Sequence, residues 1–447
     1  MAGSEAPDPA STILSAYVEN DPDAHTALNI LFLSNYFPPE VNAPANRLAD
    51  HVRVWVEDEH GVEILTAVPN FPEGRVYPSY ANRLTIEAYH GARVTRVPVF
   101  ASPNRGTMRR TLSYLSFMVS AILYRRRIRS RPDVVVATSP QFFAGIAGAW
   151  IASRFDVPFV LEIRDLWPDS IVAVGALPDS LVIRTFRRIE RWLYRRADHV
   201  VAVTDAFVDA LKSKGVPPDK VSVVKNGVDL ETVRPPSHDR RRTIRENLGI
   251  DDRFVASYVG TLGMAHGADV LLDAAALAAS SDAPDDDRFV FLLAGDGSER
   301  RSIEERLRER DTGNAILLEK QSREGALDLV AASDASVVHL RDRPLFRTVL
   351  PSKMFEAMAL GRPIILGVDG EARRTLEASG AGVFVPPENP EALLTELRRL
   401  RDDDRLRTRL EAAGPPFIRE HFNRRLLARR YADILAAVAR DGRSSAR

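Results

Sequence analysis

Short apolar runs rich in β-branched residues alternate with helical stretches along most of the chain, and this alternation constrains the fold more than any other feature. It occurs in two series and is typical of a parallel sheet with helices on both faces. The sequence therefore predicts an α/β chain with two doubly wound parallel-sheet domains of similar size. The predicted strands are 27–33, 62–67, 94–97, 134–137, 159–163, 200–203 and 221–224, followed by 254–259, 289–294, 315–318, 335–339, 363–367 and 382–385.

A segment of prolines and charged residues at 231–245 separates the two series, and we place the domain boundary there. We expect a disordered acidic tail at 1–27, an N-terminal domain at 28–235 and a C-terminal domain at 236–447, whose last helix packs back on the N-terminal domain. Ligands of doubly wound sheets bind at the carboxyl ends of the strands. With two such domains facing each other, the expected site is the cleft between them.

The composition excludes several classes of protein. The 447 residues include 61 Lys and Arg against 61 Asp and Glu, so the chain lacks the basic excess of a dedicated nucleic-acid binder. It contains no cysteine, which excludes disulfides, thiolate metal sites and cysteine nucleophiles. Residues 1–26 are polar and show no apolar core of a signal peptide. We therefore expect a cytoplasmic two-domain protein, and its size favours an enzyme.

Two glycine-containing loops follow predicted strands of the second domain. In the loop 258–267, Gly260, Gly263 and Gly267 allow close backbone approach, and the helix that follows offers free N–H groups to an anion. A tight structural turn explains the same glycines equally well. The loop 294–297 either lets a ligand ring lie against the backbone or forms a strand-to-helix turn. Both interpretations stay open for each loop.

The segment 344–363 is the most informative part of the sequence. It is predicted to form a loop and then a helix that begins near Ser352 and stops at Gly361. Lys353 and Glu356 lie three residues apart on one face of this helix. A lysine at a helix start can hold a diphosphate, and a carboxylate one turn further can accept two sugar hydroxyls. Because the surroundings are apolar, we favour this interpretation over a surface ion pair.

Six stretches together carry a resemblance to a known family: 35–45, 69–74, 139–142, 164–168, 225–229 and 351–363. The sequence resembles the retaining GT-B glycosyltransferases of family 4, particularly those that build bacterial exopolysaccharide and O-antigen chains. The resemblance spans roughly residues 28–440. It implies two facing Rossmann-like domains, with an acceptor site in the first and a nucleotide-sugar site in the second.

The resemblance and the positions after predicted strands together give a set of candidate site residues. We expect Asp165 to orient the acceptor hydroxyl, although it could instead pair with Arg164 or cap the next turn. The second catalytic candidate is Lys353. The expected donor-binding residues are Gly260, Thr261, Gly263, His266, Gly295, Asp296, Gly297, Arg347, Lys353 and Glu356, and the expected acceptor-binding residues are Glu40, Asn42, Arg47, Asn70 and Arg164.

The sequence also departs from the family's pattern. The wider family carries two glutamates separated by seven residues; the second corresponds to Glu356, but the first falls on Thr348. Where the family places Arg and Lys in the first loop of the second domain, this chain has Thr261 and His266. The diphosphate charge is therefore expected to fall on Lys353, helped by Arg343, Arg347 or Arg164.

These expectations describe a retaining transferase that moves a hexosyl or N-acetylhexosaminyl group from a nucleoside-diphosphate sugar, expected to carry uridine, to a hydroxyl of a lipid-linked or growing saccharide. No carboxylates stand at nucleophile spacing, so we expect front-face attack with the leaving diphosphate accepting the proton. No metal or other cofactor is expected, because cationic groups hold the diphosphate. Two alternatives stay open: a sugar-nucleotide epimerase of the same fold, and a non-catalytic nucleotide-sugar-binding subunit.

Two basic helices suggest a further partner. Residues 105–131 contain eight arginines and no acidic residue around the apolar stretch 112–124, which is too short to span a bilayer. The helix 184–196 is also rich in arginine. Arginine beside an apolar stripe suits an anionic membrane surface. We therefore expect peripheral association with the inner face of the plasma membrane and no binding of nucleic acid; packed helices with solvated ends are the alternative.

Overall fold

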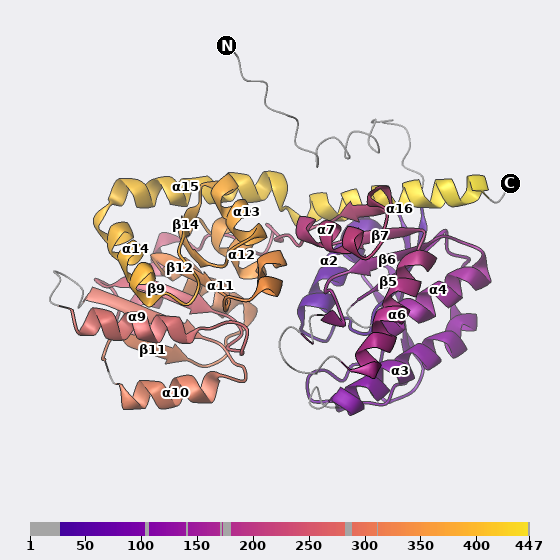
Figure 1. Ribbon diagram of the computed structural model, residues 1–447, viewed down its shortest axis with the longest axis horizontal. Coiled ribbons are helices and arrows are strands. Elements are labelled where there is room, and N and C mark those ends of the chain that lie inside the picture. The colour runs from indigo at the N-terminus through magenta and orange to yellow at the C-terminus, as the bar shows by residue number, and fades with distance from the viewer. Residues whose placement is uncertain are drawn as a thin grey trace, which may run out of the picture. The chain divides into compact units, whose positions relative to one another are not determined.

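The computed structural model describes residues 27–102, 107–139, 142–169, 172, 180–281, 288–310 and 312–445 (Figure 1). These residues form two compact α/β units. The N-terminal unit contains the described residues up to Val203, then Phe207–Val224 and the chain from Arg425 onward, and the C-terminal unit contains Thr204–Ala206 and Lys225–Arg424. Of the tail expected at 1–27, residues 1–26 lie outside the described residues.

The N-terminal unit is built on an eight-stranded sheet in the order β3-β4-β2-β1-β5-β6-β7-β8. All neighbouring strands are parallel except β3, which runs antiparallel to β4. The sheet confirms the predicted fold class, and only β3 has no counterpart among the predicted strands. The strands are β1 (Asn29–Leu33), β2 (Gly61–Ala67), β3 (Thr85–Tyr89), β4 (Ala92–Val97), β5 (Val134–Thr138), β6 (Phe159–Ile163), β7 (His199–Ala202) and β8 (Val221–Val223).

Helices cover both faces of this sheet because the side chains of its central strands are apolar on both sides. One face packs on α3 (Thr107–Tyr124), α4 (Phe142–Phe155), α6 (Leu181–Arg196) and α7 (Asp205–Ser213). The other face packs on α2 (Ala43–Glu57) and on the last helix, α16 (Arg424–Ser445). The indole Nε1 of Trp55 in α2 donates to the carbonyl of Ala428 in α16 at 2.8 Å, so the end of the chain completes the first unit.

The C-terminal unit is built on a six-stranded parallel sheet in the order β11-β10-β9-β12-β13-β14. Its strands are β9 (Phe254–Val259), β10 (Phe289–Ala294), β11 (Ala315–Leu318), β12 (Ala335–His339), β13 (Ile364–Gly367) and β14 (Gly382–Phe384). Its helices are α8 (His238–Leu248), α9 (Asp269–Ala279), α10 (Arg300–Glu309), α11 (Arg323–Ala332), α12 (Ser352–Ala359), α13 (Glu371–Ser379), α14 (Pro390–Asp402) and α15 (Asp404–His421).

The chain divides after Val224, earlier than the boundary at 235 that the sequence predicts. The backbone N–H of Val228 donates to the carbonyl of Phe422 (2.8 Å), and the N–H of Arg424 donates to the carbonyl of Val228 (3.0 Å). Val228 and Val233 also lie in a core cluster of the C-terminal unit. Proline and charge mark the end of the first strand series, but the apolar residues just before them fold with the second unit.

The strand order of the second sheet reverses between β9 and β12, which are neighbours. These two strands pair only at Ala256–Ala335 and Ser257–Ser336, so their carboxyl ends continue without pairing. In doubly wound sheets such a reversal point is where ligands bind. Among the described helices, none is long and apolar enough to cross a membrane.

Candidate functional site

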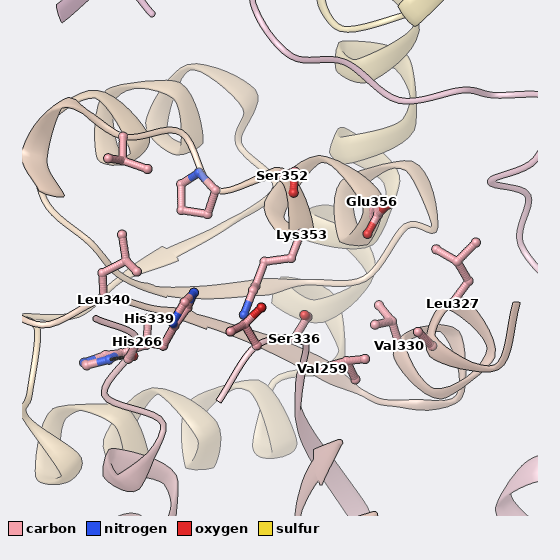
Figure 2. Close-up of a pocket in the computed structure, with 15 residues that line it drawn as sticks. Val259, His266, Leu327, Val330, Ser336, His339, Leu340, Ser352, Lys353 and Glu356 are labelled. Atoms are coloured by element: carbon pink, nitrogen blue, oxygen red, sulfur yellow. Dashed lines mark hydrogen bonds between the residues drawn. The ribbon is translucent and has the colours of Figure 1, made fainter. Parts of the chain in front are cut away.

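A cavity of about 340 Å³ lies in the C-terminal unit where β9 and β12 end (Figure 2). Its lining comes from the loop after β9, the end of β12, helix α11 and the first turns of α12. The position is the one that the strand order predicts. The lining residues are Val259, Gly260, Thr261, His266, Ala326, Leu327, Val330, Ser336, His339, Leu340, Val349, Pro351, Ser352, Lys353 and Glu356.

Lys353 lies in the first turn of α12 and reaches toward the end of β9 (Figure 2). Its Nζ is buried, and among the described residues it has no hydrogen-bond partner. Nζ stands 3.7 Å from the ring centroid of Tyr258. Burial lowers the pKa of this lysine from 10.5 to about 7, although Glu356 acts in the opposite direction. A buried amine without an acceptor is costly to the fold, and such groups concentrate at ligand sites.

Glu356 follows one turn later on the same helix and lines the same cavity (Figure 2). Burial raises the pKa of its carboxyl group, while Arg323, Arg424 and Lys353 lower it. The helix therefore presents an amine at its first turn and a carboxyl group one turn in. This arrangement brings together an anion-binding group and a group that can accept hydroxyl hydrogen bonds.

The two glycine loops pack against each other. Gly260 and Gly295 have φ angles of 142° and 150°, in the region that favours glycine. The N–H of Gly260 donates to the carbonyl of Ala294 at 2.9 Å, and a Cβ on Gly295 would collide with the carbonyl oxygen of Gly260. The side chain of Asp296 accepts from the N–H of Gly297 at 2.8 Å. The loop after β10 thus packs against the loop after β9 and helps to hold it in place.

The predicted donor residues divide into two groups. Five of them line the cavity: Gly260, Thr261, His266, Lys353 and Glu356. The other five, which do not line it, are Gly263, Gly295, Asp296, Gly297 and Arg347. Arg347 is exposed in a short 3₁₀ turn, Pro344–Thr348, and pairs with Asp342 at 3.4 Å.

Two histidines lie beside the lysine and are held neutral. His339 is buried; its Nδ1 donates to the carbonyl of His266 (2.8 Å), and its Nε2 accepts from the N–H of Glu388 (2.8 Å). Burial lowers the pKa of both, to about 4 for His266, where the Lys353 charge also contributes. Sequence reasoning missed His339, although its position at the carboxyl end of a predicted strand is a usable signal. It also missed Tyr258, because the sequence does not show that its ring lies against Lys353.

The expected acceptor residues gather at the carboxyl edge of the N-terminal sheet, where several of them hold the backbone. Glu40 is 1% exposed and accepts from the N–H groups of Asn70 and Phe71, both at 2.9 Å. Asn42 is the N-cap of α2 and accepts from the N–H of Ala45 at 2.9 Å. The side chain of Asn70 donates to the carbonyl of Val68 at 2.8 Å. These contacts shape the two loops that follow β1 and β2.

The remaining three N-terminal candidates lie around β6. Arg47 donates from Nε to Glu162 (3.2 Å) and from a second guanidinium nitrogen to the carbonyl of Val224 (2.8 Å), and both charged side chains are buried. Burial lowers the pKa of Arg164 to about 10, although Glu162 raises it. Asp165 follows directly and is half-buried. Arg47 thus pairs directly with Glu162, and the charge of the same carboxylate also acts on Arg164.

Comparison with known families defines the class of the protein. Residues 42–227 match the family described as Glycosyl transferase 4-like domain, and residues 240–416 match the family described as Glycosyl transferases group 1. These two domains, each on its own doubly wound sheet, define a glycosyltransferase of the GT-B type. The chain belongs to the family-4 type of these enzymes.

Curated relatives share a low identity with this chain over most of its length. WcaI of Escherichia coli (strain K12), named as a glycosyl transferase of colanic acid biosynthesis, is 23% identical over 381 residues, which cover 83% of this chain and 92% of that protein. A GDP-mannose-dependent alpha-mannosyltransferase of Mycobacterium tuberculosis (strain CDC 1551 / Oshkosh) is 25% identical over 363 residues, or 80% of this chain and 84% of that protein.

Solved structures share the fold. HepE of Anabaena, crystallised in complex with UDP, aligns with a TM-score of 0.67 and 16% identity over 92% of this chain and 100% of its own. Sucrose-phosphate synthase of Thermosynechococcus elongatus aligns with a TM-score of 0.70 and 19% identity over 91% of this chain and 98% of its own.

Proposed function

We propose that this glycosyltransferase moves a sugar from a nucleoside-diphosphate sugar, carrying uridine, to a hydroxyl of a lipid-linked or growing saccharide, with retention of the anomeric configuration. The observation that carries the proposal is the buried ammonium of Lys353, which faces the cavity of the C-terminal unit with no hydrogen-bond partner among the described residues. Uridine is supported by HepE, which has been crystallised with UDP and with UDP-glucose.

In this proposal the donor is held by α12 and the loop after β9. The Lys353 ammonium binds the diphosphate, together with backbone N–H groups of the Gly260 loop. Glu356, one turn further along the same helix, accepts hydrogen bonds from the two ribose hydroxyls. Thr348 cannot replace a second carboxylate, and its hydroxyl donates to the carbonyl of Leu345 at 2.8 Å. In this proposal, backbone amides near Thr348 bind the sugar in place of a second carboxylate.

The proposed reaction is a front-face displacement through an oxocarbenium-like state. The bond between the anomeric carbon and the diphosphate oxygen breaks, the acceptor oxygen bonds to the same face, and the leaving diphosphate takes the acceptor's proton. Lys353 stabilises the charge that develops on the leaving group. Asp165 orients the acceptor hydroxyl in the N-terminal unit. Because cationic and N–H groups stabilise the negative charge of the diphosphate, we propose that the reaction needs no metal.

An assay of acceptor-dependent UDP release tests this function against its alternatives. We expect the release of UDP and a glycosylated product whose anomeric configuration, followed by NMR, equals that of the donor. An epimerase would give a new sugar nucleotide without UDP release, and a non-catalytic subunit would bind UDP without turnover. Full activity in the presence of a chelator is expected, because the proposed reaction needs no metal.

Glu356→Ala should weaken binding of the donor, because the variant loses the carboxylate proposed to hold the ribose. An unchanged dissociation constant for the donor would refute the ribose role.

We further propose that the N-terminal unit associates with an anionic membrane surface on the inner face of the plasma membrane. The support is an exposed apolar stripe on α3, in which Leu112, Val119 and Leu123 are 47%, 46% and 64% exposed and share one helical face. Helix α6 adds Trp192, 42% exposed, among exposed arginines such as Arg188 and Arg195. Both helices pack against α4 on one face of the sheet.

Vesicle flotation tests the membrane proposal. Vesicles that contain anionic lipid should carry the protein, and neutral vesicles should carry much less, because basic residues near a surface add about 1 kcal/mol each. Leu123→Asp should weaken flotation, whereas Leu426→Asp, at a 50% exposed apolar residue of α16, is the matched control. Equal binding to both kinds of vesicle, or none to either, would remove the proposal.

A further inference from the structure

Tyr258 connects the lysine and the loop of the donor cavity. It is the second-last residue of β9, and its side chain is fully buried, at 0% exposure. Its hydroxyl donates to the carbonyl of Thr261 at 2.9 Å, which ties the loop after β9 to the strand. The face of its ring stands 3.7 Å from Nζ of Lys353, measured to the ring centroid. One side chain therefore touches both elements that surround the proposed diphosphate.

The ring stabilises the lysine's charge in the free protein together with the charge of Glu356, which raises the pKa of Lys353. In the part of the chain that the structure describes, no hydrogen-bond acceptor reaches Nζ. A cation within about 6 Å of an aromatic face is attracted by the negative face of the ring, most strongly where water is excluded. Since this attraction uses no N–H group, the ammonium keeps its hydrogen-bond donors for another partner.

Gly260 makes room for this arrangement. A Cβ on Gly260 would stand 3.1 Å from Nζ and 3.2 Å from Cε of Lys353. The φ angle of 142° at Gly260 also suits glycine. The lysine side chain therefore lies against the aromatic ring on one side and beside a residue without a side chain on the other, where a Cβ would crowd it.

We propose that Tyr258 is a positioning residue, whose ring holds the Lys353 ammonium in place for the diphosphate while its hydroxyl fixes the loop that forms the other wall of the cavity. The inference rests on the proposed function for the identity of the ligand. It goes beyond that function because it assigns a role to a residue of the strand itself. A tyrosine serving only as core would need a partner for its hydroxyl, but it would not need the contact between its ring and Nζ of Lys353.

NMR of the free protein tests the ring contact directly. The chain has only six lysines, at 212, 214, 220, 225, 320 and 353, so ¹³C-labelled lysine gives a spectrum simple enough to assign. The Lys353 signal is the one missing in Lys353→Arg. We expect its Hε protons to be shifted upfield by the ring in the wild type and in Tyr258→Phe, and to return to the ordinary position in Tyr258→Leu. An ordinary position in the wild type would overturn the inference.

Binding of UDP tests the consequence. Tyr258→Phe keeps the ring but loses the hydroxyl contact with the loop, so it should bind UDP up to about threefold more weakly than the wild type. Tyr258→Leu loses both contacts and should bind UDP roughly 5–30-fold more weakly. Because Tyr258→Leu alters the core, a second series keeps the ring's shape: phenylalanine with one, two and three fluorines at position 258. Each fluorine weakens the negative face of the ring, so affinity should fall stepwise. A flat series would overturn the inference.

The two proposals fail in distinguishable ways. If UDP binds without moving the Lys353 signal, the diphosphate role of the lysine is wrong, whereas the ring shift in the free protein still stands. If UDP moves the signal but fluorination has no effect on affinity, the donor site stands and the role of Tyr258 falls.

Discussion

The charge that Lys353 brings to the donor cavity depends on pH, because its amine can lose a proton. Burial lowers its pKa from 10.5 to about 7 in the free protein, and a bound diphosphate would favour the ammonium and raise that value. Between the two values, binding takes up a proton, so affinity falls as pH rises. Below about pH 7 the lysine is already charged and adds no pH dependence. The neighbouring His266, with a pKa of about 4, stays neutral throughout.

We therefore predict that the dissociation constant of UDP increases at least about tenfold between pH 7 and pH 9, with a limit of tenfold per pH unit. Calorimetry in two buffers of different ionisation enthalpy would measure the affinity and the proton uptake together. Lys353→Arg is the control, since arginine stays charged and should remove the slope. Equal affinity at both pH values in the wild type would contradict this account.

At the residue scale, the sequence predicted the site residues that lie at the end of a predicted strand or at the start of a predicted helix. Lys353 and Glu356 were identifiable because they stand one turn apart at the start of a predicted helix, and both line the cavity. Tyr258 was not, because only the folded structure brings its ring to Nζ. The acceptor role of Glu40 stays a prediction. In the structure its carboxylate accepts hydrogen bonds from three backbone N–H groups, a role that no sequence spacing reveals.

At the element scale, the donor cavity depends on the contact between the loops after β9 and β10. Gly295 is the residue that permits it, because a Cβ there would collide with the carbonyl oxygen of Gly260. We predict that Gly295→Ala weakens UDP binding more than tenfold by displacing the Gly260 loop. Gly249→Ala is the matched control: its φ of 65° is also positive, but a Cβ there meets nothing within 4 Å.

Both variants incur backbone strain of about 1 kcal/mol or more, so both should lower the melting temperature. Only Gly295→Ala should also lose affinity, and isothermal titration of UDP into each folded variant separates the two effects. If the two variants bound UDP equally well, the loop contact would have no part in the site.

The elements themselves were largely readable from the sequence. Fully buried strands such as β5 and β10 are almost entirely apolar runs, which are typical of the interior of a parallel sheet. Strand β3 was missed because it lies at the sheet edge and pairs antiparallel with β4, and its five residues alternate between half-buried and exposed. Such a strand lacks the apolar run by which the others were found.

At the scale of the whole molecule, the last helix of the chain, α16, belongs to the N-terminal unit. Leu435 of α16 is fully buried in the core that α16 shares with α2. We predict that Leu435→Ala destabilises the N-terminal unit by about 2–5 kcal/mol. Its affinity for UDP should stay within about twofold of the wild type, since the cavity lies wholly in the C-terminal unit. Thermal denaturation and titration of the same preparation check both statements; a parallel loss of UDP affinity would contradict them.

The proposed function depends above all on a nucleoside diphosphate binding against Lys353 in the cavity of the C-terminal unit. Isothermal titration of UDP into the wild type, Lys353→Ala and Lys320→Ala tests it most directly, because Lys320 is an exposed lysine of the same unit. We predict that Lys353→Ala binds at least about 30-fold more weakly, the loss of about 2 kcal/mol expected for a buried charged contact, and that Lys320→Ala binds like the wild type. Equal affinity in all three proteins would contradict the claim.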